Sequence, residues 1–252
     1  LADPAPIAAA SASQADAAPP AEEKPTEEAP AAQPAASGGV VAIDVVTSLE
    51  RVFRDPKASQ PARSHNPVQL ALARNEYESA QLVLSTASVE PLELEILPQD
   101  LVAADGRGRI AASHIAWSVV DYVRTRQPAY PVPFVGAWPD PLPTRATVRL
   151  TRDAVQPIWL TVYAPPEVPA GTYRGDILVR PVGTSAPEAE SRVSVDVTVW
   201  DFTLPDTPHL ATAFDFYPNR LEQAYERYVA DAAPRWRGAW ERLQDLFFQD
   251  ML

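Results

Sequence analysis

Two carboxylates separated by one residue are the first feature of this chain that could do chemistry. Glu76 and Glu78 lie in the segment RNEYES, and residues at i and i+2 point to the same side of a β-strand. Such a pair could act as general acid and general base in a hydrolysis. Arg74 and Asn75 adjoin the pair, however, and these residues could instead fasten a loop or a domain interface by charge-assisted hydrogen bonds. We favour the structural role, because catalysis also needs a cleft and perturbed pKa values.

Tryptophans are the second candidate, because sugar rings stack on indole faces. Four could take part: Trp117, Trp138, Trp159 and Trp200. Trp159 and Trp200 lie within apolar segments, and we expect them in the core. Trp138 opens the proline-rich segment WPDPLP, which predicts an exposed loop. Trp138 and Asp140 are therefore the best candidates for contact with a carbohydrate or with another domain.

Metal and cofactor chemistry is not indicated by the sequence. The chain has no cysteine, so it has no thiolate metal site, no disulfide framework and no cysteine nucleophile. His65, His114 and His209 are far apart and form no HExxH pattern. We expect no metal and no cofactor.

Apolar residues between Val40 and Trp200 predict short β-strands separated by turn signals. The segment LELEIL and the segment VSVDVTV alternate between apolar and polar residues, which is typical of strands with one face in water. We expect an all-β fold, an immunoglobulin-like antiparallel β-sandwich of about nine strands. The nine segments are VVAIDVV, VQLAL, YESAQLVL, LELEIL, IAWSVVDYV, ATVRL, PIWLTVYA, YRGDILVR and VSVDVTVW.

The segment from Gln156 to Gly175 combines a strand, a turn and the start of the next strand. Its first strand is apolar or aromatic on both faces, so we expect it to be covered on both sides. Three prolines after Ala164 end the strand, because proline cannot donate to a β-ladder. Gly171 precedes Tyr173 by two residues, which resembles the tyrosine corner of immunoglobulin-like sandwiches. In that corner the phenol binds an upstream backbone group.

The first 39 residues differ from the rest of the chain. They are rich in Ala, Pro and Glu and contain no aromatic residue, which predicts a disordered tether. The net charge of −12 argues against nucleic acid as a partner, and we expect no membrane span, since no run of about 18 apolar residues occurs. The chain opens on Leu1, as expected of a secreted or cell-envelope protein whose signal segment has been removed. An incomplete gene would look the same.

The succession of closely spaced strand segments ends at Trp200. DFTLPDTPHL is a proline-rich connector, ATAFDFYP predicts one short strand, and helices are predicted from Leu221 and from Pro234. The last helix reaches Leu252 without a stop signal, as if the chain were cut within an element. Its apolar stripe needs a partner surface and consists of Trp236, Trp240, Leu243 and Phe247.

Five stretches together resemble the N-terminal half of glycoside hydrolase family 123 and its glycosidase-like relatives. In that family a β-sandwich precedes a (β/α)8-type barrel that hydrolyses β-linked N-acetylgalactosaminides through an adjacent Asp-Glu pair. The resemblance implies that the acetamido group of the substrate is the nucleophile, with Glu as acid and base and Asp as its orienting partner. The stretches are LARNEYESAQLVL, WPDPLP, QPIWLTVYAPPEVPAGTYRG, VWDFTLP and LATAF.

The catalytic residues of that family are missing from this sequence. No aspartate of the chain is followed by glutamate, and 43 residues follow His209, whereas a barrel needs at least about 200. We therefore assign no catalytic residue. The predicted division is a tether over 1–39, a sandwich over 40–205 and the start of a barrel, one incomplete βα unit, over 206–252.

These observations favour a non-catalytic accessory or scaffold domain of a secreted family 123-like hydrolase, inactive on its own. Its partner would be its own C-terminal barrel. The contact between the two domains would involve Trp200, Asp201, Phe202 and Leu204. The alternative is a carbohydrate-binding or surface-adhesion module, for which amino-sugar glycans would be the partners.

Overall fold

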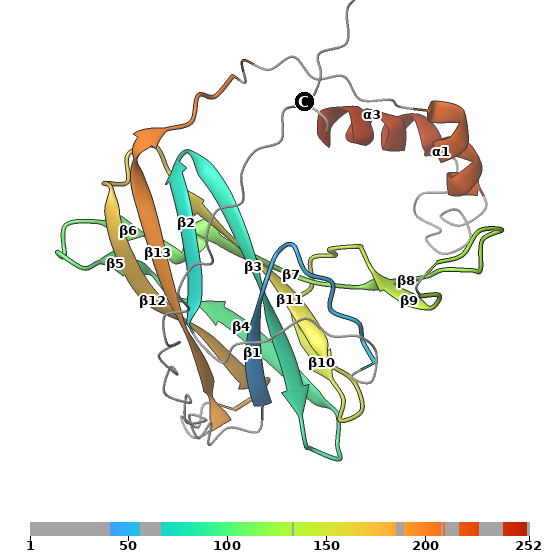
Figure 1. Ribbon diagram of the computed structural model, residues 1–252, viewed down its shortest axis with the longest axis horizontal. Coiled ribbons are helices and arrows are strands. Elements are labelled where there is room, and N and C mark those ends of the chain that lie inside the picture. Colours follow the sequence, from blue (N-terminus) through green and yellow to red (C-terminus); the bar gives the residue numbers. More distant parts are fainter. Residues whose placement is uncertain are drawn as a thin grey trace, which may run out of the picture.

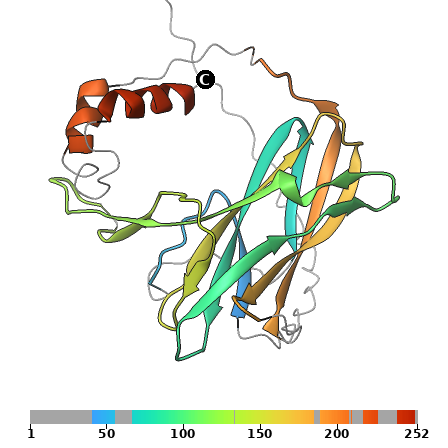
Figure 2. The same cartoon turned by 180° about the vertical axis from the view of Figure 1, so that it is seen from behind.

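The computed structural model describes residues 41–55, 67–132, 134–184, 189–207, 209, 217–226 and 239–250. Two β-sheets pack face to face, and two short helices lie apart from them (Figures 1 and 2). The first sheet has the order β1-β3-β11-β7. Its strands are β1 (Val41–Thr47), β3 (Glu76–Thr86), β11 (Gln156–Ala164) and β7 (Ile115–Val119).

The second sheet has the order β10-β4-β12-β13-β2, and β5 and β6 pair beside β12. Its strands are β10 (Val148–Leu150), β4 (Leu92–Pro98), β12 (Gly171–Pro181), β13 (Ser191–Thr203), β2 (Val68–Arg74), β5 (Leu101–Ala103) and β6 (Arg109–Ile110). A separate hairpin consists of β8 (Tyr122–Arg124) and β9 (Ala137–Pro139), and η1 (Ala112–His114) precedes β7. Strands β13 and β2 run parallel, and the chain changes sheet between β2 and β3.

The core lies between the sheets and follows the alternation of the strands. Val193, Val195 and Val197 of β13 are fully buried, and so are Ile158 and Leu160 of β11. Burying one such side chain contributes roughly 1.5 to 3 kcal/mol, so these two strands supply much of the stability of the sandwich. The all-β sandwich predicted from the sequence is confirmed, and each of the nine predicted segments contains a strand.

Three details differ from the expectation. The segment IAWSVVDYV forms two strands, β7 and β8, because the chain leaves the first sheet at Val120. Short strands β5, β6 and β9 were not predicted. The expectation that β11 is covered on both sides is wrong, since Trp159, Thr161 and Tyr163 are only half-buried.

Helices α1 (Pro218–Ala224) and α3 (Trp240–Asp250) occupy the two regions predicted to be helical. Tyr225 is buried, and its ring lies 5.8 Å from that of Trp240. The Tyr225 hydroxyl also accepts a hydrogen bond of 3.0 Å from the backbone of Ala239. None of the described helices has the length and hydropathy of a membrane-spanning segment.

Several predictions fall on residues outside the described ranges. These are the tether over 1–39, most of the strand predicted at 211–218, and Trp236 of the apolar stripe. The division into three domains stays a prediction.

Candidate interdomain surface

Asn75 forms the corner at which the chain passes from β2 to β3. Its φ of 60° lies in the left-handed region, which asparagine adopts more readily than most residues. Its backbone N–H donates to the carbonyl of Ala164 at 2.6 Å, which ties the corner to the end of β11. The sharp turn and this hydrogen bond place the Asn75 side chain at one end of the sandwich.

The side-chain amide of Asn75 joins three parts of the chain. Its Nδ2 donates to the carbonyl of Leu204 at 3.1 Å and to Oδ1 of Asp206 at 2.9 Å. Its Oδ1 accepts a hydrogen bond of 2.8 Å from the Tyr163 hydroxyl. Partial burial, and then the nearby Tyr77, raises the pKa of Tyr163, so this phenol remains a donor at neutral pH. Asn75 therefore fixes the connector that follows β13.

Arg74 binds the same connector from the end of β2. Its guanidinium donates to Oδ1 of Asp201 and to Oγ1 of Thr203, each at 3.1 Å, and its carbonyl accepts from the N–H of Leu204 at 2.9 Å. The Asp201 side chain is 85% exposed, so the ion pair alone contributes about 0 to 1 kcal/mol. The contacts of Arg74 and Asn75 together define the path of the connector.

Two aromatic rings of β13 lie at the surface beside this corner, where the pairing with β2 is bulged. Val199 pairs with Leu72 and Thr203 with Arg74, so three residues, 200–202, stand opposite a single β2 residue. Trp200 is 45% exposed and Phe202 49% exposed. Their rings stack with centroids 5.8 Å apart and an angle of 18° between the planes. We call Arg74, Asn75, Trp200, Phe202 and Leu204 the end surface.

The expectation that Trp200 belongs to the core is wrong, and strand alternation gives the reason. Val195, Val197 and Val199 face the core, so Trp200 shares the outward parity of Asp196 and Thr198. Phe202 has the same parity. Asp201, predicted to take part in the contact between the two domains, forms an ion pair with Arg74.

Trp138 has surroundings that the sequence did not predict. It lies in β9, paired with Val123 of β8, and not in a loop, so that expectation is wrong. Its ring is 5.6 Å from that of Phe53 and 5.9 Å from that of Phe134, and its Nε1 donates to the Phe134 carbonyl at 3.3 Å. The guanidinium of Arg51 lies over the ring at 5.5 Å. We call Phe53, Phe134 and Trp138 the Trp138 cluster.

The other candidates are spread over the molecule. Asp140 is exposed, and its backbone N–H donates to the Asp121 carbonyl at 3.1 Å. Trp117 packs against the core from β7. Trp159 is half-buried on the opposite face of the same sheet, so the expectation that it lies in the core is wrong. No ring contact joins any two of the four tryptophans, all of which the structure describes. The chain therefore does not bring them together as one platform.

Both carboxylates of RNEYES accept backbone hydrogen bonds. Glu76 accepts from the N–H of Ala73 and Glu78 from that of Ser79. Among the described residues, no group of three His, Asp or Glu could hold a metal ion. The arrangement supports turn geometry and offers no acid and base facing a common cleft.

Gly171 and Tyr173 lie at the start of β12. Gly171 has a φ of 149°, a conformation that favours glycine. Tyr173 is fully buried, and its hydroxyl donates to the carbonyl of Pro169 at 2.6 Å. This hydrogen bond to an upstream backbone group has the form of a tyrosine corner.

Sequence reasoning predicted a fastening role for Arg74 and Asn75, but it did not identify the left-handed corner at Asn75 or the part played by Tyr163. The signal available for Asn75 was its type: asparagine between two strand-forming segments is typical of a left-handed corner. Nothing in the sequence relates Tyr163 to Asn75, because 88 residues separate them.

The fold and the end surface define a class: a β-sandwich domain with a fastened connector leading out of its last strand. The family model described as the glycoside hydrolase 123 N-terminal domain matches residues 53–181. The chain belongs to this family. The match includes Arg74, Asn75 and the Trp138 cluster and ends before Trp200.

Solved structures show the same fold. A family 123 glycoside hydrolase from Clostridium perfringens, described for glycolipid glycan hydrolysis, is 12% identical with a TM-score of 0.53. That match covers 66% of this chain and 28% of the other, so this chain spans little more than a quarter of the enzyme's length. No curated protein matches the chain.

Smaller domains match with lower scores. The PapD-like domain 7 of human CEP192 is 11% identical, with a TM-score of 0.32 and coverage of 73% and 99%. The Salmonella SafD adhesin is 15% identical, with a TM-score of 0.30 and coverage of 63% and 97%.

Proposed function

We propose that this chain is the non-catalytic accessory domain of a secreted family 123-like glycoside hydrolase. Its end surface would hold a catalytic barrel that acts on β-N-acetylgalactosaminide-type glycans. The observation that carries the proposal is the connector, which Arg74 and Asn75 fix beside two exposed, stacked aromatic rings. An exposed aromatic pair is costly in water and typical of contact with another domain.

The substrate class rests on family membership and on the glycolipid glycan hydrolysis described for the Clostridium perfringens enzyme. The inactivity of this chain rests on the absence of an adjacent Asp-Glu pair in its sequence. The substrate class is a property of the proposed parent enzyme rather than of the sandwich.

Two measurements test the proposal. The chain alone should not hydrolyse a chromogenic β-N-acetylgalactosaminide above a heat-killed control, and activity that copurifies with it would overturn the inactive role. The gene beyond the codon for Leu252 should encode at least about 200 further residues with an Asp-Glu pair. A stop codon directly after Leu252 would overturn the accessory role.

Carbohydrate binding is the second candidate, and one observation favours it. Tyr77 is 67% exposed and stacks on Tyr163 with centroids 4.4 Å apart, so one of its faces could receive a pyranose ring. Saturable binding to amino-sugar glycans that Tyr77→Ala abolishes would support this function. Trp138→Ala is the comparison, because the Trp138 ring already contacts Phe53, Phe134 and Arg51.

A further inference from the structure

Strands β1 and β2, each at an edge of its sheet, lie on the same side of the sandwich (Figure 1). Strand β1 pairs with β3 only from Ala80 to Thr86, whereas β11 pairs with β3 from Glu76 to Leu84. The stretch Glu76 to Ser79 therefore has a strand on one edge and, among the described residues, none on the other. The outer edge of β2 pairs with no described strand either.

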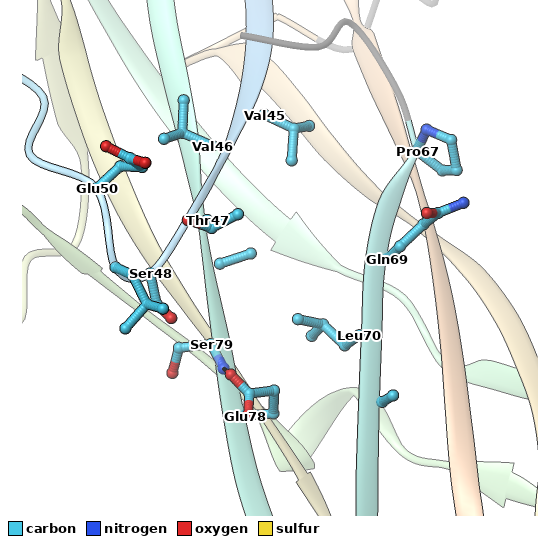
Figure 3. A pocket seen from close by; sticks show the side chains of 13 residues that line it. Val45, Val46, Thr47, Ser48, Glu50, Pro67, Gln69, Leu70, Glu78 and Ser79 are labelled. Atoms are coloured by element: carbon cyan, nitrogen blue, oxygen red, sulfur yellow. Dashed lines mark hydrogen bonds between the residues drawn. The ribbon is translucent and has the colours of Figure 1, made fainter. Parts of the chain in front are cut away.

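A groove of about 700 Å³ lies between these two edge strands, beside β3. Its floor includes Val45, Leu70 and Ala80, and Figure 3 shows Leu70 projecting from β2 toward the other two strands. Val45 and Leu70 pack against the core but remain partly exposed. Ala80 is small, which leaves room for an incoming side chain. Leu49, on the wall, is 93% exposed.

The turn after β1 forms one wall of the groove, and hydrogen bonds from Gln81 hold this turn in place. The buried side chain of Gln81 donates to the carbonyl of Thr47 and to that of Glu50, each at 2.9 Å. The groove is therefore formed before any ligand arrives, which lowers the entropic cost of binding.

The rim of the groove carries negative charge. Glu50 and Glu78 are the charged residues among those that line it, and the chain as a whole has a net charge of −12. Glu78 shares the strand parity of Ala80, so its side chain and the apolar floor face the same side. A ligand that complements this surface needs a cation close to apolar groups.

We propose that this groove binds an extended, basic peptide segment of a partner protein, which adds a strand to β3 at Glu76 to Ser79. Main-chain hydrogen bonds would provide affinity once the Glu78 carboxylate exchanges the Ser79 N–H that it accepts for the incoming cation. Alternate side chains would provide specificity. The segment would place an apolar residue over Ala80 and, two residues away, a Lys or Arg beside Glu78. The chain's own first 39 residues are a poor occupant, because they carry six carboxylates and one lysine.

The probe is the peptide Thr-Val-Thr-Lys-Thr-Val-Thr with a fluorescent label, titrated with the full chain and followed by anisotropy. Saturable binding is expected, and replacing its Lys by Glu or methylating alternate backbone nitrogens should weaken binding at least ten-fold. The Glu50→Lys, Glu78→Lys double variant should lose the same factor and gain affinity for the Glu peptide. Glu222→Lys with Glu241→Lys on the exposed helix surfaces is the matched control and should change binding less than two-fold.

Several outcomes would overturn the proposal. These are no saturable binding, equal binding of the Lys and Glu peptides, and equal binding of the methylated peptide. Binding that appears only after deletion of residues 1–39 would assign the groove to the chain's own tether. Binding that requires dissociation of a dimer, measured by sedimentation, would assign it to a second copy. Circular dichroism of each variant separates lost binding from lost folding.

Discussion

Trp138 and Trp200 each lie beside a second aromatic ring, but their surroundings are opposite. The Trp138 ring is covered by Phe53, Phe134 and Arg51 of its own chain. Trp200 and Phe202 stack on each other and remain about half exposed. The covered cluster contributes to stability, whereas the exposed pair is available for contact with another domain. Aromatic residues alone do not distinguish these roles; strand parity and the neighbouring chain do.

The largest effect separating the two regions is expected for Trp138→Ala. Removing a packed indole should cost about 3 kcal/mol in the free energy of unfolding, the lower end for core aromatic truncations because the side chain is half-buried. Urea unfolding followed by circular dichroism measures this change. Trp138→Phe keeps a ring but loses the hydrogen bond to the Phe134 carbonyl, and should cost about 1 kcal/mol. A cost below about 1 kcal/mol for Trp138→Ala would contradict the packing role.

Asn75→Ala should have the next largest effect, at the other region. The left-handed backbone disfavours alanine by about 1 to 2 kcal/mol, and the hydrogen bonds to Tyr163, Leu204 and Asp206 are lost as well. We expect a loss of about 2 kcal/mol and faster proteolysis of the connector. Asn75→Gly, which tolerates the conformation, separates the two causes: it should keep most of the stability and still release the connector. A connector that resists the protease in both variants as well as it does in the unaltered chain would contradict its fastening by Asn75.

Alkaline pH should affect the covered region through Tyr122. Burial raises the pKa of this phenol, whose hydroxyl donates to the Val52 carbonyl at 3.0 Å. The folded state favours the neutral phenol of Tyr122. The contribution of this phenol to stability is therefore fully present below about pH 10 and is lost as the pH rises further. Between the two pKa values, stability should fall by about 1.4 kcal/mol per pH unit for this group.

Urea midpoints at pH 8, 10 and 11 check this slope. Tyr122→Phe should reduce it, and Tyr130→Phe, at a position 67% exposed, is the matched control for removing a phenol elsewhere. An identical slope in the Tyr122→Phe variant would contradict the role of Tyr122.

The sandwich could be predicted because alternation in strands such as β13 is a local property of the sequence. The family could be predicted from several short stretches taken together. The end surface could be predicted only in part: the parity of Val195, Val197 and Val199 already places Trp200 outward, but the hydrogen bonds of Asn75 join residues more than 80 positions apart. The surroundings of Trp138 could not be predicted, since Phe53 and Phe134 meet it only after folding.

The exposed pair Trp200 and Phe202 should contribute least to stability. According to the proposed function, it should contribute most to association with another domain. Trp200→Ser with Phe202→Ser should change the free energy of unfolding by no more than about 0.5 kcal/mol, because both rings are about half exposed and outside the regular ladder. The double variant should show weaker fluorescence of a bound apolar dye and less self-association in sedimentation, since it removes an exposed apolar patch. Val102→Ser with Val182→Ser, at positions 48% and 46% exposed, is the matched control for loss of apolar surface elsewhere. If both double variants reduce association equally, the Trp200 and Phe202 pair has no special role in contact with another domain. If Trp200→Ser with Phe202→Ser lowers the free energy of unfolding by more than about 2 kcal/mol, the pair supports the fold of the sandwich itself.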